Sequence, residues 1–160
     1  MASIDEQSLR AIEFLLYEWA RTIDEGRLES LAELLIERGE YKVVSRFNVD
    51  RGLPVALIHT KSRAQLRDRI TSMRVANVYE PHNYRHAVSG VQVIGASNGV
   101  YEVRANYTVI RIMDHDGSMA LFACGQYQDK VVFEGGTALF QQHQVTYDSR
   151  AIDTLLVLPL

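Results

Sequence analysis

The chain has 160 residues, of which 47% are hydrophobic and 23% are charged, and this composition predicts one globular domain over residues 1–160 and excludes a disordered chain. The net charge of −3 provides no basic field for a phosphate backbone, so nucleic acid is excluded as a partner. A single cysteine excludes an intrachain disulfide. The sequence shows neither a signal peptide nor the run of about 20 apolar residues that a membrane span needs. We therefore expect a cytoplasmic protein without a membrane partner.

The first 40 residues have the three-to-four-residue period of helices. Ser3 and Glu6 have the spacing of a capping box, which predicts the start of a helix that Gly26 ends. A second, shorter helix is predicted over residues 28–35 and is closed by Gly39. The apolar positions of the first helix are Leu9, Ile12, Leu15, Leu16, Trp19, Ala20 and Ile23.

One strand and one more helix are predicted before the period changes. Residues 41–44 are typical of a strand, and residues 48–54 indicate a polar turn region that contains a glycine and a proline. Ser62 and Gln65 form a second capping box at the start of a third helix. The inward positions of that helix are Leu66, Ile70 and Met73.

The second half of the chain has the two-residue period of β-strands. Asn98 and Gly99 predict a hairpin turn, because both tolerate the positive φ that such turns need. The alternation slips at Val109 and Ile110, which predicts a β-bulge that bends the strand. Strands are predicted over residues 88–94, 101–112, 119–134 and 138–147.

Helices followed by a meander of long strands predict an α+β fold. We expect three N-terminal helices packed on a bent antiparallel sheet, enclosing a cone-shaped core. This arrangement resembles the cystatin-like, nuclear-transport-factor-like group of folds.

The last six residues, 155–160, are all apolar, whereas exposed chain ends are usually polar. Each large aliphatic side chain left in water forfeits roughly 1.5–3 kcal/mol relative to burial. We therefore expect residues 152–157 to add a strand to the sheet of this chain, and the last few residues to contact a partner. The candidate interface residues are Leu156, Leu158 and Leu160.

The densest polar cluster is residues 79–86, between the third helix and the first long strand. Two histidines four residues apart share a face only on a helix, and Pro81 argues against a helix, so a metal site is disfavoured. We expect the His86 ring to be hydrogen-bonded and Arg85 to pair with a carboxylate, or the cluster to contact another subunit. Its candidate interface residues are Tyr79, His82, Arg85 and His86.

Two other polar features are candidate sites. Asp24 is a candidate general base together with Tyr17 and the histidines; the competing interpretation is a solvated carboxylate before a glycine turn. The run of residues 141–144 is polar on both faces of its strand, which favours a wet interface through Gln142 and Gln144.

Five short motifs follow one another along the chain. They are Arg51-Gly52-Leu53-Pro54, Leu66-Arg67-Asp68-Arg69-Ile70, Tyr84-Arg85-His86, Gly125-Gln126-Tyr127-Gln128-Asp129-Lys130 and Asp153-Thr154-Leu155. In this order they resemble the small (β) subunits of aromatic-ring-hydroxylating dioxygenases over nearly the whole chain. The terephthalate type is the most similar, and the anthranilate and salicylate types are close.

The resemblance implies a nuclear-transport-factor-like fold in an α3β3 hexamer. In such assemblies the large (α) subunit holds a Rieske [2Fe–2S] cluster and a mononuclear Fe(II), a reductase acts indirectly as a partner, and the small subunit is mainly structural. The single cysteine agrees, because a Rieske site needs two cysteines and two histidines. The catalytic ligands of the family have no counterparts here, so no catalytic, cofactor-binding or metal residue is assigned to this chain.

Two functions are consistent with these features. The first is a non-catalytic β subunit that supports dihydroxylation of an aromatic carboxylate by the α subunit. The second is an independent isomerase or dehydratase of the same fold, with Asp24, His82 or His86 as the base. The second needs a solvent-connected cavity that reaches one of these groups, and a core filled by large aromatic side chains would exclude it. Those side chains are Trp19, Tyr101, Phe122 and Phe140.

Overall fold

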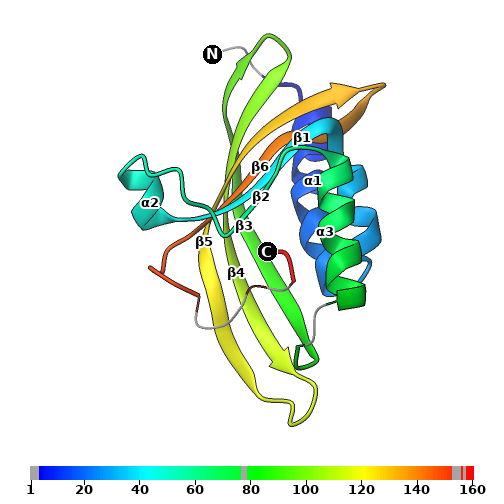
Figure 1. Ribbon diagram of the computed structural model, residues 1–160. Helices are drawn as coiled ribbons and strands as arrows, with labels where there is room; N and C mark the ends of the chain where they lie inside the picture. The colour runs from blue at the N-terminus through cyan, green and yellow to red at the C-terminus, as the bar shows by residue number, and fades with distance from the viewer. Residues whose placement is uncertain (1–3, 77–78, 153–155, 157) are drawn as a thin grey trace.

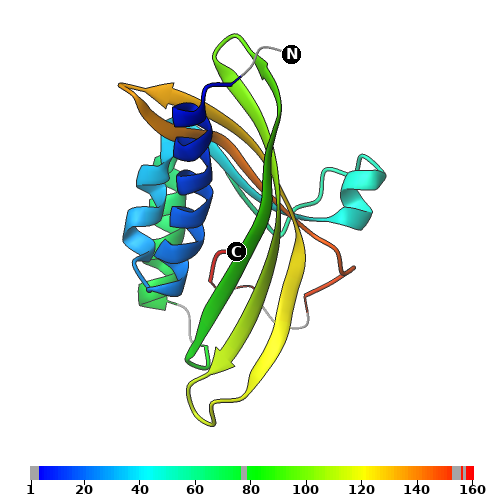
Figure 2. The ribbon, with the colours of Figure 1, turned by 180° about the vertical axis from the view of Figure 1, so that it is seen from behind.

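The computed structural model describes residues 4–76, 79–152, 156 and 158–160. One layer of helices lies against one side of a long twisted sheet, and a short helix, α2, projects on the other side (Figure 1). Figure 2 shows the same two layers from behind. The elements in order are α1 (Glu6–Asp24), the 3-10 helix η1 (Leu28–Leu34), β1 (Leu35–Ser45), α2 (Arg46–Asp50), β2 (Ile58–Thr60), α3 (Arg63–Ala76), β3 (His82–Ser97), β4 (Val100–Met113), β5 (Met119–Glu134) and β6 (Thr137–Tyr147).

Helix α1 begins at a different cap from the predicted one. The side chain of Asp5 accepts a hydrogen bond from the Ser8 amide at 2.8 Å, and Ser3 lies outside the described residues. Asp5 satisfies one of the four amides that a helix start leaves free. The predicted end is confirmed, because the helix stops at Asp24 and Gly26 has a φ of +71°. The buried face is Ile12, Leu15, Leu16, Trp19, Ala20, Thr22 and Ile23.

The predicted second helix is partly wrong. Residues 28–34 form a 3-10 helix, and Leu35 already belongs to β1. Gly39 lies inside this strand, at an irregularity in its pairing with β6, and does not end a helix. A Cβ at Gly39 would lie 2.7 Å from the Leu35 Cβ and 2.9 Å from the Phe140 carbonyl oxygen, so glycine is needed there for close backbone approach.

The region between β1 and α3 also differs from the prediction. Residues 46–50 form the short helix α2, whose start is capped by the Ser45 hydroxyl accepting from the Asn48 amide at 3.1 Å. The polar turn is therefore confined to the residues after α2, where Gly52 has a φ of +62°. Strand β2 was not predicted; it has three residues and is held by antiparallel pairing with β1.

The sheet is mixed, and the expectation of an antiparallel sheet is corrected. Its strand order is β2-β1-β6-β5-β4-β3, and every neighbouring pair is antiparallel except β1 and β6. β1 and β6 are far apart in the sequence, so no hairpin turn fixes their relative direction. The helices over one face make the fold α+β, as predicted.

The long strands follow the prediction closely. Asn98 and Gly99 form the β3–β4 turn with φ of 52° and 77°, and the β4–β5 register shifts between Val109 and Ile110, as expected for a bulge. Strand β3 is longer than predicted, because it begins at His82 and takes in most of the polar cluster.

The core lies between the helices and the inner face of the sheet. Its largest fully buried side chains include Trp19, Tyr41, Tyr107, Tyr127 and Phe140, whereas Tyr101 and Phe122 are partly buried. Trp19 meets Phe140 edge to face at 5.8 Å between ring centroids. In the part of the chain that the structure describes, no helix has the length and apolar character needed to cross a membrane.

Candidate functional site

Asp24 and His86 are brought together at the junction of α1 and β3. One carboxylate oxygen of Asp24 lies 2.6 Å from the His86 Nδ1, and the other accepts from the His86 backbone amide at 2.9 Å. Arg85 reaches the same carboxylate at 3.9 Å. The expectations for His86 and Arg85 are thus confirmed, and the solvated interpretation of Asp24 is wrong, because its side chain is 6% exposed.

This pair has the composition of a general base but little access. A cavity of about 450 Å³ borders it, lined also by Tyr17 and Arg21. The His86 side chain is 0% exposed, and its Nε2 has no hydrogen-bond partner among the described residues. Because a general base must reach the proton that it abstracts, this geometry suits a tether between the end of α1 and the edge strand β3.

The other histidine of the cluster lies apart from this pair. The His82 Nδ1 is 2.8 Å from the Glu80 carbonyl oxygen, and its ring lies 5.6 Å from the ring of Tyr79. Tyr84 continues this aromatic run into the core, where it stacks on Phe122 at 5.2 Å.

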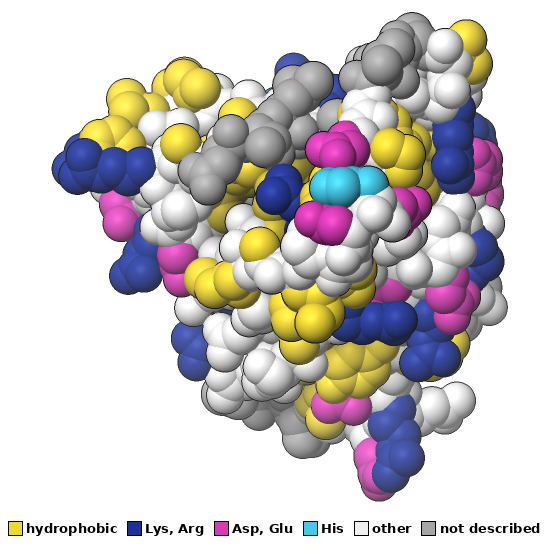
Figure 3. Space-filling model, turned by 90° about the horizontal axis from the view of Figure 1, so that it is seen from below, with side chains coloured by type: hydrophobic (Ala, Val, Ile, Leu, Met, Phe, Trp, Pro, Cys, Tyr) yellow, Lys and Arg dark blue, Asp and Glu magenta, His cyan; other side chains and the backbone are white. Residues whose placement is uncertain are grey.

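The same end of the molecule carries charged and exposed apolar groups side by side. His115 forms ion pairs with Glu80 at 2.9 Å and Asp116 at 3.2 Å. Met119 and Leu121 are exposed nearby on β5. Figure 3 shows this end from below, where acidic groups flank a histidine and hydrophobic side chains lie close by.

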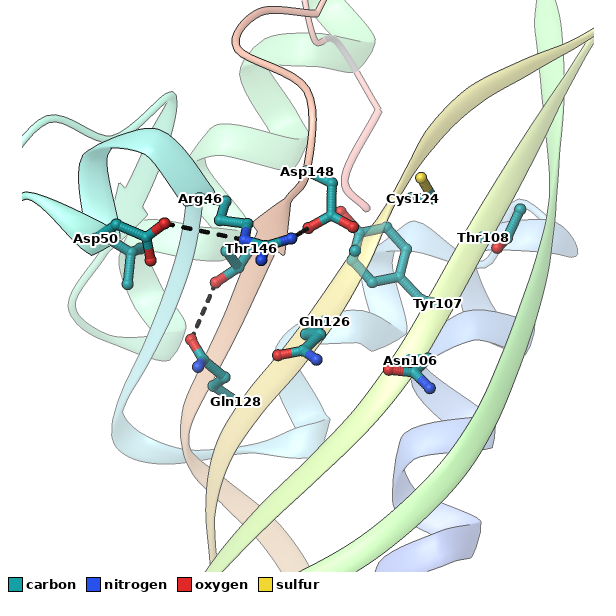
Figure 4. A pocket seen from close by; sticks show the side chains of 12 residues that line it. Arg46, Asp50, Asn106, Tyr107, Thr108, Cys124, Gln126, Gln128, Thr146 and Asp148 are labelled. Carbon is teal, nitrogen blue, oxygen red and sulfur yellow. Dashed lines mark hydrogen bonds and ion pairs between the residues drawn. The ribbon is translucent and has the colours of Figure 1, made fainter.

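The outer face of the sheet, which the helices leave uncovered, holds a polar cavity of about 470 Å³. It lies between α2 and the strands β4, β5 and β6 (Figure 4). Arg46 reaches over it, 3.6 Å from Asp148 and 3.9 Å from Asp50. Below it, the Thr146 hydroxyl donates to the Gln128 side chain at 3.1 Å. The remaining lining residues are Val49, Asn106, Tyr107, Thr108, Cys124, Gly125 and Gln126.

Amide side chains continue this outer face across the sheet. Gln144 donates to Gln128 at 2.8 Å, and Arg104 donates to Gln92 at 2.9 and 2.7 Å. Gln142 pairs in register with Lys130 on β5 and lines a second shallow cavity. The two predicted glutamines therefore lie on one polar surface, which we call the outer amide face: Gln92, Arg104, Gln126, Gln128, Gln142 and Gln144.

Sequence reasoning missed the apolar surface beside this face. Four large aliphatic residues of α2 and the following loop are exposed, and two of them lie within residues 48–54, which were interpreted as a polar turn. An exposed apolar cluster next to a polar cavity is typical of a surface that another protein covers. The signal was present in the sequence as the spacing of Val49, Leu53, Val55 and Leu57.

Sequence reasoning also missed a buried pair inside the core. His143 was interpreted as part of an all-polar run, but its side chain is fully buried and its Nδ1 lies 2.8 Å from Asp129. The two residues are directly opposite each other on β5 and β6. Burial raises the pKa of the Asp129 carboxyl, and the neighbouring histidine offsets this only in part.

The end of the chain is buried in the chain's own core. Leu156, Leu158 and Leu160 are buried, and Leu160 has 0% exposure. The strand predicted over residues 152–157 falls mainly on positions outside the described residues. The expectation that these three leucines contact a partner stays a prediction, and in this chain their surface is already covered by the core.

Within residues 4–76, 79–152, 156 and 158–160, no three His, Cys, Asp or Glu side chains gather closely enough to hold a metal ion. Cys124 is half-buried on β5 at the edge of the outer cavity.

Comparison with known proteins gives consistent matches over most of the chain. Residues 7–142 match the SnoaL-like domain family. The chain is 35% identical over 138 residues to the anthranilate 1,2-dioxygenase small subunit of Burkholderia cepacia, covering 86% of this chain and 85% of that protein. It is 33% identical over 142 residues to a terephthalate 1,2-dioxygenase terminal oxygenase component, subunit beta 2, of a Comamonas species, covering 89% and 92%.

A solved structure agrees with these matches. A chain from Novosphingobium aromaticivorans, described as the β subunit of an aromatic-ring-hydroxylating dioxygenase, superposes with a TM-score of 0.86 at 28% identity. The match covers 96% of this chain and 97% of that one.

Proposed function

The chain belongs to the SnoaL-like domain family and, within it, to the small (β) subunits of aromatic-ring-hydroxylating dioxygenases, and from this premise we propose that it is the non-catalytic β subunit of a terminal oxygenase. The observation that carries the proposal is the likeness to small subunits over nearly the whole length of both proteins. In this role it supports a large subunit that dihydroxylates an aromatic carboxylate, in the cytoplasm, with a reductase as the indirect source of electrons.

The donor set of this chain supports placing the cofactors in the large subunit. A Rieske [2Fe–2S] cluster needs two cysteines and two histidines, and this chain has one cysteine. The residues present therefore do not fit a Rieske site. We assign the Rieske cluster and the mononuclear Fe(II) to the partner, in an α3β3 hexamer.

We further propose that the outer amide face and the exposed aliphatic residues of 49–57 are the main contact with other subunits. Gln142 and Gln144 lie on this face, next to the cavity under Arg46. Polar groups around an apolar patch have the composition of a subunit interface that traps water. A second contact is proposed at the beginning of β3, through Tyr79, His82 and Arg85. All three residues are at least partly exposed.

The test is co-expression with the neighbouring large-subunit gene, followed by native mass measurement. We expect a stable complex that contains equal numbers of both chains, and a large subunit that loses stability or activity when expressed alone. A large subunit that is fully active and equally stable without this chain would contradict the proposal.

The Asp24–His86 pair separates the subunit function from an isomerase or dehydratase function. In a structural subunit, Asp24→Asn lowers only the stability of the fold and leaves turnover by the assembled oxygenase unchanged. An independent enzyme that uses this pair as its base would lose turnover in the same variant.

A further inference from the structure

The cavity that borders the Asp24–His86 pair lies between the last two turns of α1 and the first half of the edge strand β3 (Figure 2). Its volume of about 450 Å³ falls within the range of about 300–1,000 Å³ that is typical of small-molecule sites. The buried pair forms part of the wall and ties the helix to the strand, so both sides of the cavity are held in place.

Both carboxylates that line this cavity already have partners. Asp24 is 6% exposed and contacts the ring and the backbone amide of His86 at 2.6 and 2.9 Å. Glu25 follows directly after α1 and forms an ion pair with Arg27 at 2.8 Å. These two acidic groups therefore leave the arginines of the cavity available for another anion.

Two arginines from different elements line the cavity. Arg21, on α1, is exposed and forms no ion pair within the part of the chain that the structure describes. The side chain of Arg85, on β3, is 71% exposed and lies 3.9 Å from Asp24, and an exposed contact of this length contributes little. A guanidinium group matches the planar geometry of a carboxylate, so this pair favours a carboxylate ligand.

The cavity also has an aromatic and apolar wall. Tyr17 is 41% exposed and lies four residues before Arg21, so the two side chains are neighbours on one face of α1. Ala20 and Val88 add apolar surface from the helix and from the strand. An inorganic anion would leave this wall uncovered, whereas an organic anion with a flat ring would cover it.

We propose that this cavity binds a small aromatic carboxylate, with the carboxylate between Arg21 and Arg85 and the ring against Tyr17 and Val88. The binding is inferred from the residues of the cavity alone. That the ligand is of the same chemical class as the substrate of the large subunit rests on the proposed function. Arg85 is shared with the second proposed subunit contact, so Arg21 and Tyr17, which lie outside that contact, carry the test.

The test is calorimetric titration of the full chain with benzoate. We expect saturable binding, and binding of benzamide that is weaker by about tenfold or more, because benzamide keeps the ring and lacks the charge. Cyclohexanecarboxylate keeps the charge and lacks the flat ring, so it should bind severalfold more weakly than benzoate. Acetate, which has no ring, should bind most weakly of the charged probes.

Two variants test the arginine and the aromatic wall. Arg21→Gln should weaken benzoate binding by about tenfold. Tyr17→Ala should remove the preference for benzoate over cyclohexanecarboxylate. Both residues are exposed, so the fold should tolerate both changes.

The matched controls are exposed residues of α1 that do not line the cavity. Arg10→Gln removes the same charge from the same helix, where Arg10 pairs with Glu6. Phe14→Ala removes an aromatic side chain that is 66% exposed. Both controls should leave benzoate binding unchanged.

The proposal is overturned if benzoate does not bind saturably, or if it binds Arg21→Gln as tightly as the native chain. Equal binding of acetate and benzoate would show a general anion site and would also overturn it. Tighter binding of N-acetyl-L-aspartic acid amide than of benzoate would indicate an acidic side chain of a protein partner as the occupant, with the same consequence. Binding is measured on this chain alone and assembly on the complex, so either result can fail without the other.

Discussion

Asp129 is a costly residue in the core, because its carboxylate is taken out of water and is bonded only by His143 and, more weakly, by the backbone amide of Gln144 among the described residues. Its second carboxylate oxygen has no hydrogen-bond partner among the described residues. Burial disfavours the charged form, which is why the pKa of Asp129 is raised. The fold therefore carries an internal group whose charge opposes stability.

This predicts a pH dependence of the free energy of unfolding. An unfolded Asp has a pKa of about 3.9, so from that value up to the higher folded pKa only the folded state holds the proton. Stability then falls with rising pH by at most about 1.4 kcal/mol per unit. Asp129→Asn keeps an oxygen for His143 and removes the charge, so its stability relative to the native chain should rise above pH about 4. Urea unfolding at a series of pH values measures this.

Asp116 provides a comparison of opposite sign. The Ser118 amide and hydroxyl lower the pKa of this exposed carboxyl, so it stabilises the fold above its unfolded pKa and loses that effect as the pH falls. Asp116→Asn should therefore be less stable than the native chain at pH values above the unfolded pKa of this carboxyl.

For the buried carboxyl, the contradicting result is a pair of parallel curves of unfolding free energy against pH for the native chain and Asp129→Asn.

Asp24 makes a different residue-scale contribution, since its carboxylate satisfies two groups of His86 at once. Asp24→Ala leaves both without a partner in a buried place and should cost about 2–4 kcal/mol. Asp24→Asn can satisfy both after a change of histidine tautomer and should cost about 1 kcal/mol or less. Chemical denaturation measures both, with the exposed Glu25→Ala as the control. Equal losses for the alanine and asparagine variants would rule out the tether.

At the scale of elements, the close approach of β5 and β6 depends on one glycine. A Cβ at Gly125 would lie 1.9 Å from the Thr146 carbonyl oxygen and 3.0 Å from the Tyr147 Cα, and backbone atoms cannot move aside as flexible side chains do. Gly125→Ala should therefore force the two strands apart at the point where the outer cavity is lined, and should cost about 3 kcal/mol or more.

Gly136→Ala is the matched control for this prediction. Gly136 has a φ of +80° but nothing within 4 Å of an added Cβ, so the cost is the backbone strain of about 1–2 kcal/mol. Thermal unfolding of both variants distinguishes a steric clash from general intolerance of glycine replacement. A similar loss in both would contradict the clash.

Local elements were predicted from the sequence wherever the cause was local. The Asn98–Gly99 turn and the β-bulge at Val109 could be predicted from the sequence, because turn residues and side-chain alternation act over a few neighbouring residues. Leu35 was assigned to the second helix and Gly39 to its end, since leucine suits either structure and the pairing with β6 decided the outcome, whereas residues 41–44 were correctly predicted as a strand.

At the scale of the whole molecule, the α+β class and the helix-on-sheet arrangement could be predicted, because a helical period in the first half of the chain is followed by a strand period in the second half. Contacts between residues far apart in the sequence could not be predicted. The parallel direction of β1 and β6 and the Asp129–His143 contact depend on strand register, which one sequence does not specify. The outer amide face was seen only as two glutamines, because its other members lie on separate strands.

The outer amide face also gives the prediction that tests the molecule as a subunit. Gln142→Glu with Gln144→Glu places two negative charges on this face and leaves the core unchanged. If a partner covers it, these charges lose their water on assembly, a cost that Lys130 opposite Gln142 offsets only in part, and the complex with the large subunit should weaken by about tenfold or more. The stability of the isolated chain should change by about 1 kcal/mol or less, which is the hydrogen bond from Gln144 to Gln128.

Gln7→Glu is the matched control, because Gln7 is an exposed glutamine on α1, on the helix side of the molecule. It changes the net charge in the same direction and should leave assembly intact. Dissociation of the co-purified complex, followed by native mass measurement over a dilution series, compares the two variants. Equal assembly of the native chain and the Gln142 and Gln144 double variant would mean that the partner binds elsewhere, with the Tyr79 end of β3 as the remaining proposed contact.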